Sequence, residues 1–386
     1  MKKTIVALVA FAFLFSAMGT MAQDKKESKY DKPSKAKDVK ILKKNVLSEK
    51  DRKKFDDYEE LLKGKPTKPS PVPDSDDSEI WATGTVGTLF DEMEGNKYAI
   101  VIGLANYPGT EYDLCVSDAK TVYDDPESAF TDENLKYYCK DQDSLDMEKT
   151  LREEYGFSDI RIFTDADATY DNIKSAVDEI VPNLKPEDEM VFFFSGHGAT
   201  REDEDGDVEF DGLDEGIIIY DQDYHEEDFI AEDGSELDSP EYSFSDASYI
   251  WDDQLREWFD EADTDRIFFY FDTCGAGGMN DLEGDGRVLA FSSKEGQSSS
   301  TYRLGGVQTD DNVIQESSGL FTHYFVLRGM YDGYADGYNP LKKNSKDPLK
   351  YDGKVTIEEA FGYTFPIVKY KQTPVLNDRF ENDLLL

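Results

Sequence analysis

Cysteine and histidine are scarce in this chain, with three of each among 386 residues. The cysteines are Cys115, Cys139 and Cys274, so at least one thiol has no partner within the chain. No two of them have the spacing of a zinc site, which excludes a cysteine-based zinc centre. A disulfide between Cys115 and Cys139 is one alternative, and it would leave Cys274 as the odd thiol.

Basic residues are also few, with 42 Lys and Arg against 84 Asp and Glu. They are concentrated at the start of the chain, where residues 23–68 hold 16 basic and 10 acidic side chains. The rest of the mature chain has 24 basic and 74 acidic residues, a formal charge of about −50. This excess argues against a nucleic-acid partner and suits a cationic substrate, bound metal ions or a saline setting, although solubility alone accounts for most surface carboxylates.

Long apolar runs are missing except at residues 1–22, where Lys2 and Lys3 precede an apolar stretch that ends in small residues. This pattern predicts a cleaved signal peptide and a protein exported to the periplasm or the extracellular medium, with no transmembrane anchor after cleavage. Residues 23–80 then read as a basic leader and a Pro/Ser-rich linker, with one helix over residues 48–64. Residues 81–386 form the predicted folded domain.

Short apolar runs that end in polar or small residues predict strands in the folded domain. Between them lie amphipathic stretches that predict helices, so strands and helices alternate and a mainly parallel α/β sheet follows. The predicted strands are 97–103, 159–165, 188–198, 266–274 and 287–293, and the predicted helices lie near 114–123, 145–155, 170–184, 251–262, 319–330 and 356–365.

Two of these strands end in a reactive side chain. The run "RIFFYFDTCGAGG" leads to Cys274 and "VFFFSGHG" leads to His197, each with glycines nearby. The carboxyl ends of parallel strands meet at one edge of a sheet, where α/β proteins place their chemistry. A cysteine nucleophile needs a nearby base to remove its proton, and the imidazole of His197 can serve as that base. His197 alone would more often be a structural histidine, but paired with the matching cysteine strand it favours a catalytic dyad.

Several motifs together resemble the caspase-like cysteine peptidases, most of all the metacaspase branch and its bacterial relatives. They occur in the family's order: "KYAIVIGLANYPG", "LCVSDAKTVYD", "FFFSGHG", "DEGIIIYD", "YIWDDQLREWF", "FFYFDTCGAGG", "GLFTHYFVLRGM" and "QTPVLND". The resemblance implies a caspase-like three-layer sandwich, with a mainly parallel sheet flanked by helices. Gly275 and Ala276 depart from the polar residues common after the family's nucleophile.

The resemblance implies a cysteine endopeptidase. Cys274 would attack the peptide carbonyl, the backbone N–H groups of Gly198 and Cys274 would hold the oxyanion, and His197 would move the protons. Asp272 stands two residues before the nucleophile, on the same side of its strand, and Ser195 holds the matching place before His197.

By resemblance, Cys115 and Asp118 join Asp272 and Ser195 in the primary pocket. Its carboxylates would select Lys or Arg before the scissile bond. The alternative role for Asp118 is an acidic residue at a helix N-terminus.

The acidic segment beginning at Asp203 does not fit an EF-hand loop, because Val208 stands where that loop needs glycine. The family resemblance points instead to a calcium site made of Asp214, Asp252, Asp253 and Asp281. Solvated acidic loops are the competing interpretation. The chemistry itself requires no cofactor.

Two other functions stay open: an inactive, calcium-dependent binding module, and a peptidase of the clostripain or gingipain kind. The basic leader of residues 23–80 adds a regulatory hypothesis. A flexible segment rich in lysine suits an acidic cleft, so the leader is expected to occupy it as an autoinhibitory pro-segment and to be cut after Lys or Arg.

Overall fold

The structure is a computed structural model and describes residues 39–62, 95–107, 112–114, 136–202, 212–221, 246–308, 312–338, 353–380 and 383–386. Within these residues no helix is both long and apolar enough to cross a membrane. The predicted signal peptide, the predicted linker and the predicted helix near 114–123 lie outside the described residues, apart from Leu114.

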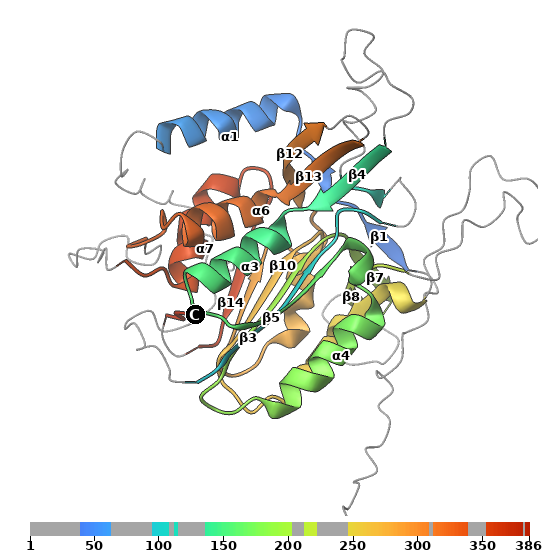
Figure 1. Ribbon diagram of the computed structural model, residues 1–386, viewed down its shortest axis with the longest axis vertical. Coiled ribbons are helices and arrows are strands. Elements are labelled where there is room, and N and C mark those ends of the chain that lie inside the picture. The colour runs from blue at the N-terminus through green and yellow to red at the C-terminus, as the bar shows by residue number, and fades with distance from the viewer. Residues whose placement is uncertain are drawn as a thin grey trace, which may run out of the picture.

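A mostly parallel sheet forms the centre of the fold (Figure 1). In the described part of the chain its strands lie in the order β14 (Val375–Asp378), β11 (Arg287–Phe291), β10 (Ile267–Asp272), β6 (Glu189–Ser195), β3 (Lys97–Gly103) and β5 (Asp159–Thr164). All neighbours pair in parallel except β11 and β14. Each of the five strands predicted from sequence is present, and the mainly parallel sheet is confirmed.

Helices cover both faces of this sheet, which gives the expected three layers (Figure 1). One face packs against α4 (Tyr170–Ile180) and α5 (Asp252–Phe259), and the other against α3 (Asp143–Glu153), α6 (Leu320–Thr322), the continuing helical segment η6 (His323–Tyr331) and α7 (Ile357–Val368). The alternation of side chains along a strand explains both cores, because successive residues point to opposite layers. In β10, Phe269 and Phe271 join the α4/α5 core, and Phe268 and Tyr270 join the other.

Two smaller sheets flank the central one. The first has the strand order β1 (Lys40–Leu42), β7 (Gly198–Glu202), β8 (Leu213–Ile218) and β9 (Tyr249–Trp251). The second has the order β2 (Asn45–Val46), β12 (Ser300–Gln308), β13 (Asn312–Gly319) and β4 (Lys136–Asp141). The sequence analysis did not predict these sheets. Their strands are short or polar, and the leader contributes one strand to each of them.

The leader is therefore not flexible over its whole length, because residues 39–62 pack on the folded domain. Helix α1 (Glu49–Leu62) lies across η6 and the end of β12 (Figure 1). Phe55 is 1% exposed and stacks on Tyr370, with ring centroids 5.1 Å apart. Glu59 accepts hydrogen bonds from His323 (2.9 Å) and from Arg328. The helix predicted for the leader is confirmed, and its apolar anchor holds it against the domain.

Truncating a core aromatic residue tests the packing of the central sheet against the α4/α5 layer. Phe269 is fully buried and contacts Phe259 with ring centroids 4.8 Å apart, so Phe269→Ala should lower the free energy of unfolding by about 3–5 kcal/mol. Leu145→Ala is the control, since Leu145 is 41% exposed and should change stability by less than about 0.5 kcal/mol. Urea unfolding followed by circular dichroism measures both, and equal losses would contradict the assigned core.

Candidate active site

The relative position of His197 and Cys274, the predicted catalytic pair, is set by the register of β6 and β10. Ser195 pairs with Asp272 at the carboxyl ends of these parallel strands, and His197 and Cys274 each follow two residues later. The two backbones then touch: a Cβ built on Gly198 would lie 2.3 Å from the carbonyl oxygen of Cys274. Gly198 therefore has to be glycine for the approach. The structure brings together the residues that the sequence placed at one sheet edge.

The hydrogen bonds of His197 fix its tautomer. Its Nε2 lies 2.8 Å from the carbonyl oxygen of Tyr112, which can only accept, so Nε2 carries the proton. Its Nδ1 accepts from the backbone N–H of Lys44 at 3.1 Å. The Tyr107 hydroxyl accepts from the His197 backbone N–H at 2.7 Å, which anchors the loop. The ring is thus a neutral imidazole whose one lone pair is already engaged by the leader.

The pKa values of both groups are shifted toward their neutral forms. Burial lowers the pKa of His197 to about 3, helped by the nearby ammonium groups of Lys44 and Lys43. Burial also raises the pKa of Cys274 to about 11, although the backbone N–H of Ser299, 3.1 Å from the sulfur, opposes this. In this arrangement both groups therefore favour their neutral forms, a thiol and an imidazole, rather than a thiolate and an imidazolium.

Beneath the pair lies an acidic pocket that holds Lys44. The Lys44 Nζ is 3.1 Å from Asp272 Oδ1 and 3.1 Å from Ser195 Oγ, and the side chain is 1% exposed. Asp272 also accepts from Ser299 Oγ (2.8 Å) and from the backbone and side chain of Thr322. Burial lowers the pKa of Lys44, but the carboxylates of Asp272 and Asp143 outweigh it and raise the pKa above its ordinary value.

Asp143 is a pocket residue that the sequence analysis missed. It is the first residue of α3 and accepts from Ser195 Oγ at 2.6 Å and from the backbone N–H of Gly319. Burial raises its pKa to about 6, the Lys44 ammonium lowers it, and Asp272 raises it further. No local signal marks this role, because the pocket joins Asp143 to strands far away in the sequence.

The other predicted pocket residues, Cys115 and Asp118, lie outside the described residues. Cys139 is disulfide-bonded, and Cys274 is a free thiol, as the odd cysteine count indicated. Ser195 and Asp272 do line the pocket, so the strand-position argument found two of its members.

Three of the four aspartates predicted to bind calcium form ion pairs with arginines. Asp214 accepts from Arg201 Nε at 2.6 Å, and Arg256 bridges Asp253 and Asp281, the latter at 2.7 Å. Asp252 and Asp253 begin α5 and are buried. Among the described residues no group of three or more His, Cys, Asp or Glu side chains that could hold a metal ion is found. The calcium site stays a prediction.

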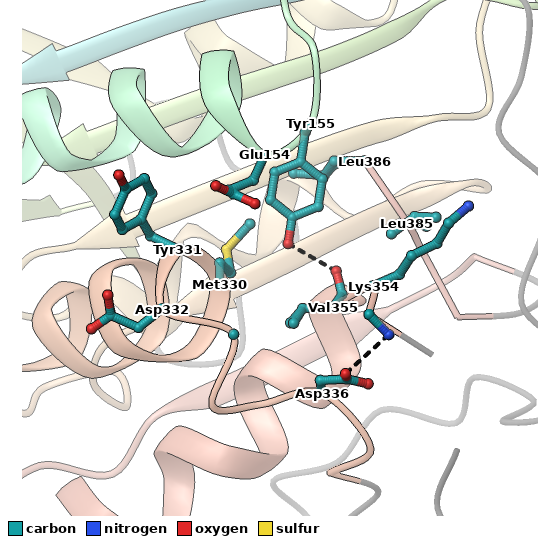
Figure 2. Close-up of a pocket in the computed structure, with 12 residues that line it drawn as sticks. Glu154, Tyr155, Met330, Tyr331, Asp332, Asp336, Lys354, Val355, Leu385 and Leu386 are labelled. Atoms are coloured by element: carbon teal, nitrogen blue, oxygen red, sulfur yellow. Dashed lines mark hydrogen bonds between the residues drawn. The ribbon is translucent and has the colours of Figure 1, made fainter. Parts of the chain in front are cut away.

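A separate cavity of about 280 Å³ is lined by Tyr155, Val355 and Leu385 among others (Figure 2). Its Leu385 carbonyl accepts from Arg266 just before β10 begins, whereas Cys274 follows the end of that strand. Six residues of strand span about 20 Å, so the cavity is remote from the catalytic pair. Figure 2 shows the Tyr155 hydroxyl donating a hydrogen bond to the Val355 carbonyl oxygen in this cavity.

Thiol reactivity tests the protonation state of the pair. With a pKa of about 11, Cys274 should react slowly with iodoacetamide at pH 8 and faster with each pH step, until its rate levels off near pH 11 or the chain unfolds. Mass spectrometry of the Cys274 peptide measures the rate. A rate that is already at its plateau at pH 7 would contradict a neutral thiol.

Comparison with known proteins agrees with this geometry. Residues 97–238 match the family model "Metacaspase, peptidase C14 domain". The chain is 26% identical to Metacaspase-4 of Arabidopsis thaliana over 247 residues, which cover 61% of this chain and 44% of the relative. It is 29% identical to Metacaspase-1A of Neurospora crassa over 202 residues, covering 51% and 35%. The aligned part thus spans less than half of these relatives. The family-model match covers less than half of the chain, and it includes His197 but ends before Cys274, so over that part this chain is similar to the metacaspase-type cysteine peptidases.

Proposed function

We propose that this protein is a cysteine endopeptidase that cleaves peptide bonds after Lys or Arg and is exported in a leader-inhibited form. The proposed specificity rests on one observation, the buried ion pair between the Lys44 ammonium and the Asp272 carboxylate. A pocket that buries one cation with a carboxylate and a hydroxyl suits the side chain of a substrate Lys or Arg, and its own negative charge disfavours Asp. The metacaspase family model supports peptidase chemistry.

The proposed reaction is acyl transfer through the pair. His197 takes the thiol proton of Cys274, and the thiolate attacks the carbonyl carbon of the scissile bond. The backbone N–H groups of Gly198 and Cys274 stabilise the oxyanion. The carbon–nitrogen bond breaks as His197 protonates the leaving amine, and water then hydrolyses the thioester with His197 as its base.

Leader inhibition follows from the same contacts. The Lys44 side chain fills the pocket, and its amide N–H takes the lone pair that His197 needs to accept the thiol proton. Lys44 would therefore block both the binding of a substrate side chain and the transfer of the thiol proton to His197. Calcium and export remain predictions, and no step of this mechanism uses a metal.

The first test asks whether the pair is a peptidase at all. The chain from Gln23 onward is incubated with reporter peptides that end in Arg, Lys or Asp, with calcium and with a chelator. We expect cleavage after Arg and Lys only, and none in Cys274→Ala or His197→Ala at unchanged circular dichroism. Equal cleavage after Asp would refute the acidic pocket, and cleavage that survives Cys274→Ala would assign the nucleophile elsewhere. A folded chain that cuts nothing under any condition would favour the binding-module alternative.

Lys44→Ala tests leader inhibition. Removing the ammonium that fills the pocket should raise turnover of an Arg reporter by about tenfold or more, because without its buried charge pair the leader competes less well with the reporter for the pocket. Lys53→Ala is the matched control: Lys53 is exposed on α1, and its loss should leave turnover unchanged. Equal turnover in Lys44→Ala and the unmodified chain would show that the leader does not limit activity.

Asp272→Asn, made in the Lys44→Ala background, tests the pocket without the Lys44 ammonium. We expect kcat/KM for Arg and Lys reporters to fall on the order of 10²-fold, mostly through KM, because a buried guanidinium loses its charge partner. Asp263→Asn, at an exposed position, is the control. A fall in kcat alone would assign Asp272 to the chemistry rather than to binding.

A further inference from the structure

Any substrate of a cysteine peptidase has to lie across the catalytic pair in one direction. The leaving nitrogen follows the residue whose side chain fills the pocket, and the imidazole has to protonate that nitrogen. The residues after the scissile bond therefore lie on the His197 side, along β7, which begins at the next residue. The residues before it lie on the other side, along β12, next to Ser299 and Cys274.

The leader crosses the same pair with the opposite order. Residues Lys40–Leu42, which precede Lys44, pair antiparallel with β7, with Leu42 opposite Gly198. The residues after Lys44 run along β12 instead: Asn45 N–H donates to the Ser299 carbonyl at 2.8 Å, and Asn45–Val46 pair in parallel with Ser300 and Thr301.

We propose that the leader is a reversed-polarity inhibitor, which binds the substrate pocket through Lys44 but presents no bond that the catalytic pair can cut. The inference rests on the proposed function, since it takes the direction of a substrate from the peptidase chemistry. The backbone direction of the leader would protect it from cleavage, and the cleft edges formed by β7 and β12 would accept a strand of either direction.

The nitrogen atoms on each side of Lys44 explain the protection. The bond after Lys44 would release Asn45 N, but that nitrogen is held by Ser299 on the side away from the imidazole. The nitrogen that His197 does contact is Lys44 N, whose N–H points at Nδ1. The acyl carbon of that bond belongs to Lys43, and the Lys43 side chain lies outside the pocket, with Nζ 3.9 Å from the centre of the Tyr112 ring.

Helix α1 supplies the affinity that a reversed strand needs. It follows β2 directly and docks through Phe55 and through Glu59, which accepts from both His323 and Arg328. Asp56 accepts from the Tyr302 hydroxyl at 3.0 Å, on the same strand β12 that pairs with β2. None of these contacts depends on the catalytic pair, so the anchor keeps the leader in place whether or not a bond is cut.

The test separates cutting within one molecule from cutting between molecules. It uses the full chain from Gln23, as unmodified protein and as Phe55→Ala and Glu59→Gln, which loosen the anchor, with Lys53→Ala as control. New N-termini at Asn45 are counted by mass spectrometry over a tenfold range of protein concentration. A synthetic peptide of residues 39–50 is the free substrate, and an Arg reporter gives the basal activity.

We expect all active forms to cut the free peptide after Lys44, while the docked bond in the unmodified chain and in Lys53→Ala stays intact. In the loosened variants the docked bond should be cut between molecules, so the fraction cut per hour falls about tenfold on tenfold dilution. A fraction that is independent of dilution would show cutting in place and would overturn the reversed orientation.

An active enzyme that leaves the free peptide uncut after Lys44 would also overturn it, because direction would then explain nothing. If neither the reporter nor the peptide is cut by any form, the proposed peptidase function fails and the inference fails with it, and the reporter distinguishes this result from the others.

Discussion

The buried charge between Lys44 and Asp272 is the constraint on which the cleft depends. Asp272 and Asp143 both lie in the interior below the catalytic pair, and two desolvated carboxylates in one site repel each other unless a cation or a proton is present. In this structure the leader supplies the cation. In the proposed peptidase a substrate ammonium or guanidinium would take the place of the Lys44 ammonium, so the same electrostatic need would underlie specificity and inhibition.

The position of that charge comes from the strands. Parallel pairing of β6 with β10 puts Ser195 beside Asp272, and one further step of two residues puts His197 beside Cys274. Aromatic side chains on both faces of β10 leave the strands no room to slip, since a shift of one residue would exchange the two cores. The pocket residues and the His197/Cys274 pair therefore both depend on the register between β6 and β10, and a shift in that register would move both.

The sequence alone predicts the residues at the ends of β6 and β10 but not the residues that other elements bring next to them. His197, Cys274, Ser195 and Asp272 follow from strands whose ends can be read locally. Asp143 could not be found this way, because only the folded chain brings the start of α3 next to β13. The aspartates proposed for calcium were chosen by motif, yet Arg201 and Arg256 are within reach of three of them, and a motif does not show which cation a carboxylate meets.

A leader that blocks a peptidase has to resemble a substrate and yet survive it. A substrate-like strand would bind well but would be cut, and a strand without a basic side chain would survive but would leave the carboxylates unpaired. Reversing the strand resolves the conflict, because the pocket recognises the Lys44 side chain while the catalytic pair recognises the direction of the backbone. Strand edges permit this, since parallel and antiparallel pairing both satisfy backbone hydrogen bonds. In the proposed peptidase the pocket would therefore select the side chain, and the positions of His197 and Cys274 would select the backbone direction.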